Sequence, residues 1–74
     1  MSFITQAYLV EKYGLRLSVD QLAEVLAMKP QTIYNQVSKC TLAVPTYVDG
    51  GKRFADYRDV AIYLDECRAR KREA

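Results

Sequence analysis

Hydrophobic side chains recur every three to four residues along four segments of the chain, a spacing that predicts amphipathic helices. The first of these segments ends at Gly14, a residue suited to the left-handed conformation that closes many helices. Its hydrophobic positions are Ala7, Leu9, Val10 and Tyr13. Beyond it, Leu15 and Leu17 flank Arg16, and we expect these residues to form a short extended link.

The second helix is expected to begin at Ser18, because serine is a strong N-cap and Gln21 follows three residues later, as in a capping box. Its hydrophobic stripe consists of Leu22, Ala23, Val25, Leu26 and Met28. Pro30 ends this helix and is tolerated in the first turn of the next one. In that third helix, Ile33 and Val37 are four residues apart and make a narrow inward stripe.

From Leu42 onward the pattern changes to short β-like runs. VPTYV and KRFA lie on either side of DGG, which predicts a β-hairpin. Asp56 is suited to cap a last helix, which continues into a basic tail at residues 67–74. The buried face of that helix is expected to be Val60, Ala61, Tyr63, Leu64 and Cys67. The chain is therefore expected to be mainly α with a small β-hairpin, in the order helix, helix, turn, helix, hairpin, helix.

The composition limits the kind of protein. Seventy-four residues, half of them hydrophobic, predict one globular domain over residues 1–74. No apolar run approaches the roughly 20 residues of a membrane span, and residues 1–14 lack the features of a signal peptide, so we expect a cytoplasmic protein. Without histidine, no metal or cofactor site is expected. Cys40 and Cys67 are expected to be reduced, partly buried thiols, although a disulfide between them stays open.

The net charge of +2 does not by itself indicate a nucleic-acid partner, but the distribution of charge is informative. Residues 25–48 carry Lys29 and Lys39 and no acid, residues 49–66 are net acidic, and residues 67–74 are basic. Phosphate repels carboxylates at close range, so an acid-free stretch is typical of a surface that approaches a nucleic-acid backbone. The third helix lies within this stretch.

The outward face of the third helix consists almost wholly of amides and hydroxyls. With Ile33 and Val37 inward, Asn35 points directly away from the core at about 100° per residue. Amides can pair bidentately with adenine in a major groove, hydroxyls can read either strand, and lysine suits guanine or phosphate. The residues predicted to contact DNA are Gln31, Thr32, Tyr34, Asn35, Ser38 and Lys39. An ordinary solvent-exposed helix is the competing interpretation.

The spacing of the second and third helices fits a helix-turn-helix, in which the N-terminal end of the second of the two helices enters a groove of DNA. Ala23 provides the small residue that such a motif needs where its helices cross. Ala27 stands where the turn often holds glycine. Alanine is acceptable there if its backbone stays out of the left-handed region, and that is our expectation.

The tip of the hairpin is the second predicted DNA contact. Gly50 and Gly51 allow positive φ and let backbone N–H groups approach a phosphate. Lys52 and Arg53 follow directly and are suited to hold the sugar-phosphate backbone or to enter a minor groove. The competing interpretation is a plain exposed turn with scattered charges, which Asp49 favours.

The segments LSVDQLAEVLAMKPQTIYNQVS and YVDGGKRFADYRDVAIYLDE together resemble the excisionase-like, MerR-type winged helix-turn-helix proteins of bacteria and their mobile elements. In that family a basic hairpin, the wing, follows the recognition helix, and a phenylalanine leads into a final helix of the form Asp-Val-x-x-Tyr-Leu. The matching residues are Phe54, Asp59, Val60, Tyr63 and Leu64. The resemblance covers about residues 17–66, so residues 1–16 would add an extra N-terminal helix.

The resemblance implies sequence-specific binding to double-stranded DNA by a protein without catalytic activity. Family members act either as excisionases, which set the direction of site-specific recombination, or as small transcriptional regulators, and both alternatives stay open. The implied partners are duplex DNA, a second copy in a homodimer or in cooperative assembly on repeated sites, and an integrase or RNA polymerase. Carried over by position, the major-groove and wing residues would be Gln31, Thr32, Asn35, Lys39, Gly51, Lys52 and Arg53.

Two other classes of function were weighed. An enzyme is the least favoured, because the chain has no histidine to act near neutral pH and no Gly-rich phosphate loop. A protein-interaction adaptor built on the same fold is the main alternative. In that case Leu9, Val10 and Tyr13 of the first helix would pack on a partner or on a second copy.

Overall fold

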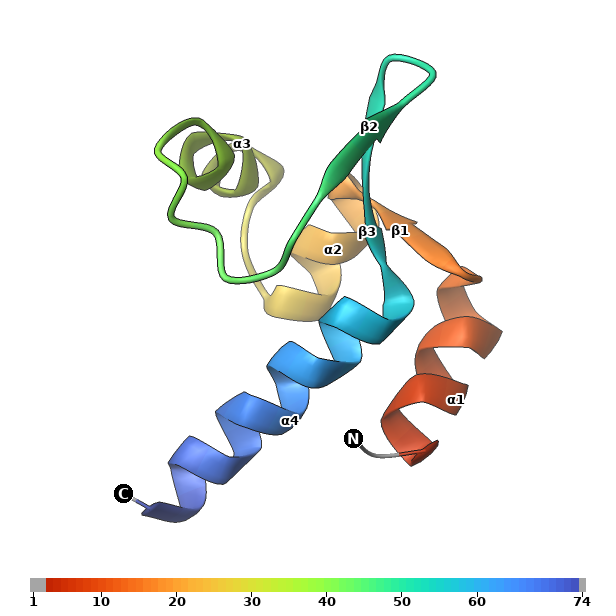
Figure 1. The fold of residues 1–74 in the computed structure, drawn as a ribbon, viewed down its shortest axis with the longest axis vertical. Coiled ribbons are helices and arrows are strands. Elements are labelled where there is room, and N and C mark those ends of the chain that lie inside the picture. Colours follow the sequence, from red (N-terminus) through yellow and green to blue (C-terminus); the bar gives the residue numbers. More distant parts are fainter. Residues whose placement is uncertain (1–2, 74) are drawn as a thin grey trace.

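A computed structural model describes the backbone of residues 3–73 and the side chains of residues 3–70 (Figure 1). The fold is mainly helical with a small three-stranded antiparallel sheet, and its helices and hairpin follow the predicted order. The elements are α1 (Phe3–Tyr13), β1 (Arg16–Ser18), α2 (Val19–Leu26), α3 (Pro30–Ser38), β2 (Tyr47–Asp49), β3 (Lys52–Asp56) and α4 (Tyr57–Glu73). Because α4 extends to Glu73, most of the basic tail is helical.

The sheet joins two distant parts of the chain. β3 lies between β1 and β2 and pairs antiparallel with both. The expected extended link around Arg16 is therefore largely a strand, β1, that continues the hairpin into a third strand. Leu17 of β1 lies opposite Ala55 of β3, and both are buried. Since side chains alternate across a strand, Arg16 and Phe54 belong to the outer face of the sheet.

One cluster of buried hydrophobic residues holds the elements together. Its members are Leu9, Leu17, Val19, Leu22, Ala23, Ile33, Val44, Ala55, Val60 and Ala61. All four helices contribute to this cluster, as do β1, β3 and the loop after α3. β2 is exposed at all three positions, so the hairpin projects away from the core beside α3 (Figure 1).

Local signals in the sequence set the ends of three helices. Ser18 Oγ accepts a hydrogen bond from the Gln21 backbone N–H at 3.3 Å, and Gln21 Oε1 accepts one from the Ser18 N–H at 3.0 Å. This confirms the predicted capping box. Gly14 ends α1 with φ 92°. Asp56 caps α4 by accepting from the Arg58 N–H at 2.8 Å, and the Arg58 side chain holds the pKa of this carboxyl below its usual value.

The turn between α2 and α3 differs from our expectation. Ala27 has φ 57° and ψ 43°, so its backbone lies in the left-handed region that we expected it to avoid. The end of α2 explains this conformation. The N–H of Met28 donates to the carbonyl of Ala23 at 2.9 Å, and the N–H of Ala27 donates to that of Glu24 at 3.2 Å. These bonds require a left-handed residue at this position, whatever its side chain.

Both cysteines are free thiols, as expected, but their exposure differs. Cys67 is half-buried on α4, as expected. Cys40 was also expected to be partly buried, but it is exposed. Cys40 has φ 58° and follows the C-terminal end of α3, where the chain turns away from the core. Within residues 3–73, the helices are too short or too polar to cross a membrane.

Candidate nucleic-acid interface

The orientation of α3 is set by one fully buried side chain. Ile33 is 0% exposed, and Val37, one turn later, is half-buried against the core. Asn35 and Gln31 therefore lie on the outward face, and both are exposed. The Gln31 side-chain amide donates from Nε2 to Asn35 Oδ1 at 3.1 Å. This bond joins the two amides into one ordered hydrogen-bonding unit on the surface.

The other predicted residues of α3 lie around this pair. Tyr34 and Ser38 are exposed, as is Lys39 at the C-cap, whereas Thr32 is half-buried. The N-cap, Lys29, has an extended backbone and makes no side-chain capping bond. In the first turn, Pro30 has no N–H and the Thr32 N–H donates to the Lys29 carbonyl at 3.0 Å, so the Gln31 N–H is the donor left at this end, and α3 carries no acid in that turn. This end of the helix suits an anionic neighbour.

The hairpin tip has the backbone conformation predicted from its glycines. Gly50 has φ 60° and Gly51 has φ 79°, a pair of positive values that matches a two-residue hairpin turn. Lys52 is exposed at the start of β3. Arg53 is half-buried, and its Nη1 donates to Thr46 Oγ1 at 2.9 Å. Thr46 therefore orients the Arg53 side chain, while the Lys52 side chain extends into solvent.

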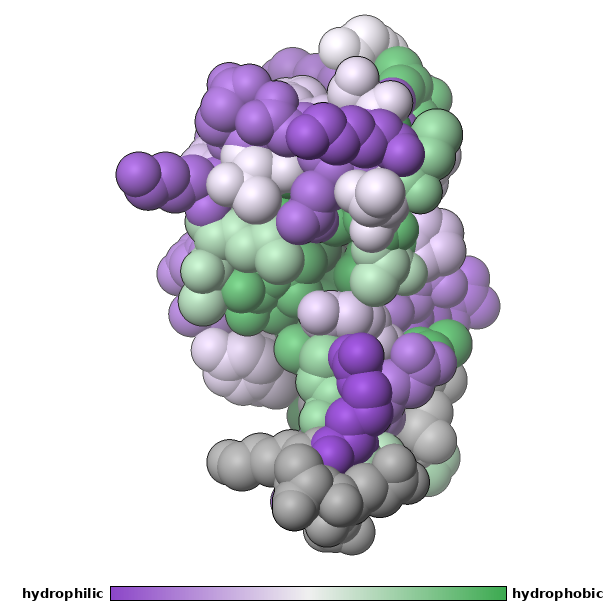
Figure 2. All heavy atoms as spheres, turned by 90° about the vertical axis from the view of Figure 1, so that its left-hand side faces the viewer, coloured by the Kyte–Doolittle hydropathy of each residue, from purple (hydrophilic) through white to green (hydrophobic). Residues whose placement is uncertain are grey.

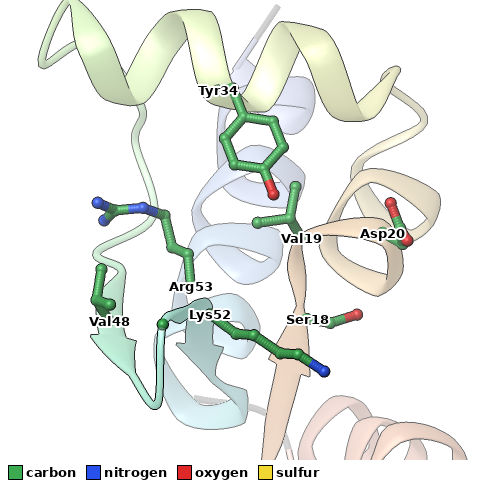
Figure 3. A pocket seen from close by; sticks show the side chains of 8 residues that line it. Ser18, Val19, Asp20, Tyr34, Val48, Lys52 and Arg53 are labelled. Carbon is green, nitrogen blue, oxygen red and sulfur yellow. The ribbon is translucent and has the colours of Figure 1, made fainter.

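An open groove runs between α3 and the hairpin (Figure 3). It is lined by Ser18, Val19, Asp20, Tyr34, Val48, Gly51, Lys52 and Arg53. Tyr34 points into the groove from α3 (Figure 3). Arg53 and Lys52 come from the hairpin, and in this view the Lys52 side chain extends toward Ser18. Asp20 lies at the α2 side of the groove and is exposed. The lining thus has two cations and one acid, a balance that favours a phosphate.

Arg16 neutralises the acid at the hairpin tip. Its Nη1 donates to Asp49 Oδ2 at 2.7 Å, and its guanidinium lies 3.8 Å from the centre of the Phe54 ring. The side chain thus crosses the outer face of the sheet from β1 over β3 to β2. The Asp49 carboxylate, which in the sequence alone favours a plain exposed turn, is therefore in an ion pair. Within the described hairpin, Lys52 is the charged residue next to the glycines that has no ion-pair partner.

On the side away from the hairpin, the polar face of α3 ends at an apolar hollow (Figure 2). The hollow is lined by Leu26, Met28, Gln36, Thr41, Leu42, Ala43, Val44 and Tyr63. Gln36, half-buried, forms the boundary between the polar residues and this hollow. The polar face of α3 is thus bounded by the groove on one flank and by apolar side chains on the other.

The structure brings together only part of the predicted set. Tyr34, Gly51, Lys52 and Arg53 line one groove. The other predicted residues lie outside its lining: Gln31, Thr32, Asn35, Ser38, Lys39 and Gly50. Sequence reasoning missed the contribution of Arg16, whose partner Asp49 is 33 positions away. It also missed the start of α2, which reaches the groove only because β1 pairs with β3. No local pattern in the sequence indicates either contact.

The chemistry of this surface is that of hydrogen-bonding and cationic side chains. Among the side chains of residues 3–70, no three from Asp, Glu or Cys come close enough together to hold a metal ion. The surface therefore offers amide, hydroxyl, guanidinium and ammonium groups, which are the groups that bind base edges and phosphates.

Comparisons of the chain with family models, with curated proteins and with solved structures found no match.

Proposed function

We propose that this chain is a winged helix-turn-helix protein that binds double-stranded DNA at specific sequences and has no catalytic activity. In this proposal α2 and α3 are the two helices of the motif, α3 enters the major groove, and the hairpin is the wing. The protein acts in the cytoplasm, either as an excisionase of a phage or mobile element or as a small transcriptional regulator.

One observation carries the proposal: α3, whose outward face is acid-free and hydrogen-bonding, lies beside a basic, glycine-tipped hairpin, and Tyr34 of α3 lines one groove with Lys52 and Arg53. A helix whose only task is to face water usually carries mixed acidic and basic residues. The outward face of α3 carries the bonded amides of Gln31 and Asn35 instead. Such a face fits a major groove, where acids would be repelled by the phosphates on both sides.

The contacts within the protein suggest separate roles for the two elements. Asn35 Oδ1 accepts from Gln31, which orients the Asn35 amide and leaves its two N–H donors and a second lone pair for a base edge. Lys52 is exposed, which suits contact with a phosphate that carries no sequence information. Arg53 is held by Thr46 and is suited to a fixed position on the backbone or in the minor groove.

Asn35→Ala and Lys52→Ala test this division of roles. With a duplex selected from a random pool as the cognate site, Asn35→Ala should cost about 1–3 kcal/mol of cognate binding and little non-specific binding. Lys52→Ala should weaken binding to all duplexes and lower the salt slope by about 1. Fluorescence anisotropy over a salt series measures both quantities.

Gln36→Ala is the matched control, because Gln36 is on the same helix but borders the apolar hollow. It should leave cognate affinity unchanged. The proposal fails if Asn35→Ala and Lys52→Ala behave like this control, or if no duplex is enriched from the pool. Affinity that scarcely responds to salt would indicate a protein-interaction adaptor instead.

A map of the bound sites distinguishes the two biological roles. An excisionase should bind sites clustered beside the attachment core of an integrase, and a transcriptional regulator should bind sites beside a promoter. Footprinting on the DNA that surrounds the gene would decide between them.

A further inference from the structure

The outward half of α1 is almost wholly apolar. Successive residues of an α-helix are rotated by about 100° around its axis, and in α1 the buried side is marked by Leu9. The half opposite Leu9 carries Phe3, Ile4, Ala7, Tyr8, Val10 and Glu11. All of these residues are exposed. Every residue of α1 is described, and Glu11 is the one charged residue of this half. An apolar half of a helix is normally covered by other protein atoms.

The core of this chain covers only the inner side of α1. Leu9 is 1% exposed and Tyr13 packs against the same cluster, whereas Phe3 and Ile4 are 87% and 83% exposed. The structure therefore uses α1 to close its own core and leaves a second apolar face in water. Contiguous exposed patches of this kind mark protein contacts.

We propose that the outward half of α1 packs against the same surface of a second copy, with the two helices antiparallel about a two-fold axis at Ala7. Residues whose numbers add to fourteen are then opposite each other. Ala7 meets Ala7, Ile4 meets Val10, and Phe3 meets Glu11. An alanine at the crossing point allows the close approach of two helices, and apolar side chains meet on either side of it.

The position of the single charge fits this arrangement. Glu11 lies in the C-terminal half of α1, so in the antiparallel pair it is near the N-terminal turn of the partner helix. That turn contains no acid of its own, and a helix N-terminus favours a negative charge. A parallel pair would instead place the two Glu11 carboxylates side by side, which is unfavourable.

The available area is sufficient for a specific dimer of modest stability. Phe3, Ile4, Tyr8 and Val10 are 87%, 83%, 55% and 37% exposed. At roughly 150–250 Å² for a large side chain, these fractions give about 500 Å² per copy. The total of about 1,000 Å² meets the lower limit for a specific interface.

The location of α1 leaves the candidate nucleic-acid interface free. In Figure 1, α1 and α3 lie on opposite sides of the molecule, and the hairpin tip points away from α1. Two copies joined through α1 therefore keep both α3 helices and both hairpins uncovered. The proposal does not depend on DNA binding, because it is argued from α1 alone.

The experiment compares Ala7→Glu with Ala69→Glu. Both alanines are exposed on helices, so the two variants have the same helix propensity cost and the same change in charge. Sedimentation equilibrium over a dilution series, without DNA, should give twice the 8.5 kDa chain mass for the wild type and for Ala69→Glu. Ala7→Glu should stay at the single-chain mass, with an unchanged circular dichroism spectrum.

Cross-linking tests the position of the axis. In a chain with Cys40→Ser and Cys67→Ser, Ala7→Cys should form an intermolecular disulfide on mild oxidation, and Ala69→Cys should not.

A wild type that stays monomeric over the whole sedimentation series would overturn the proposal. So would a dimer that survives Ala7→Glu, or an Ala7→Cys chain that does not cross-link. DNA binding by any of these variants is a separate measurement, so loss of the proposed function would not affect this result.

Discussion

The left-handed backbone of Ala27 is a local strain that the sequence retains. For residues with a Cβ, this conformation costs roughly 1–2 kcal/mol. Glycine avoids that steric cost, but it loses more conformational entropy on folding than alanine does. Ala27 is exposed, so its methyl group contributes little to packing. We therefore expect Ala27→Gly to stabilise the protein by about 1 kcal/mol, measured as a higher midpoint of urea unfolding.

Ala69→Gly is the control for that substitution. Ala69 is exposed within α4, where glycine should cost about 0.5–1 kcal/mol because it loses more conformational freedom on folding. The two substitutions should move the midpoint in opposite directions. A fall of the midpoint in both variants would contradict the interpretation of Ala27 as strained.

At the scale of elements, the hairpin is positioned by a side chain from another strand. Arg16 contacts Phe54 and Asp49, but both members of its ion pair are exposed, so the pair adds little to stability. Its larger effect is on the charge near the tip. Arg16→Ala should leave the unfolding midpoint nearly unchanged but weaken duplex binding several-fold, because Asp49 becomes an unpaired anion beside Lys52.

The double variant separates this effect from a direct contact. If Arg16 acts by neutralising Asp49, Arg16→Ala with Asp49→Asn should recover most of the lost affinity in the same anisotropy titration. An affinity as low as that of Arg16→Ala alone would instead mean that Arg16 touches the DNA itself.

At the scale of the whole molecule, the distance between partners along the chain decides what the sequence could predict. The Ser18–Gln21 capping box and the Asp56 cap involve residues two or three positions apart, and both were predicted correctly. The contact of Arg16 with Asp49 depends on β1 pairing with β3. The extended link at Arg16 was predicted, but no local pattern indicates that it pairs with a strand about 40 positions later. The conformation of Ala27 was missed because the end of α2, not the alanine itself, determines it.

The same whole-molecule scale includes self-association, which would change stability as well as mass. A chain of 74 residues buries only about 60% of its unfolded surface, less than a larger domain does, so a second copy adds stability through mass action. If the copies pair through α1, the free energy of unfolding should rise with protein concentration, by up to about 1.4 kcal/mol per mole of dimer for each tenfold increase. Urea titrations at several concentrations measure this dependence. Ala7→Glu should show none, and its midpoint should lie below that of dilute wild type only by the helix-propensity cost of glutamate. A midpoint independent of concentration in the wild type would mean that each chain is stable alone, with the apolar half of α1 in water.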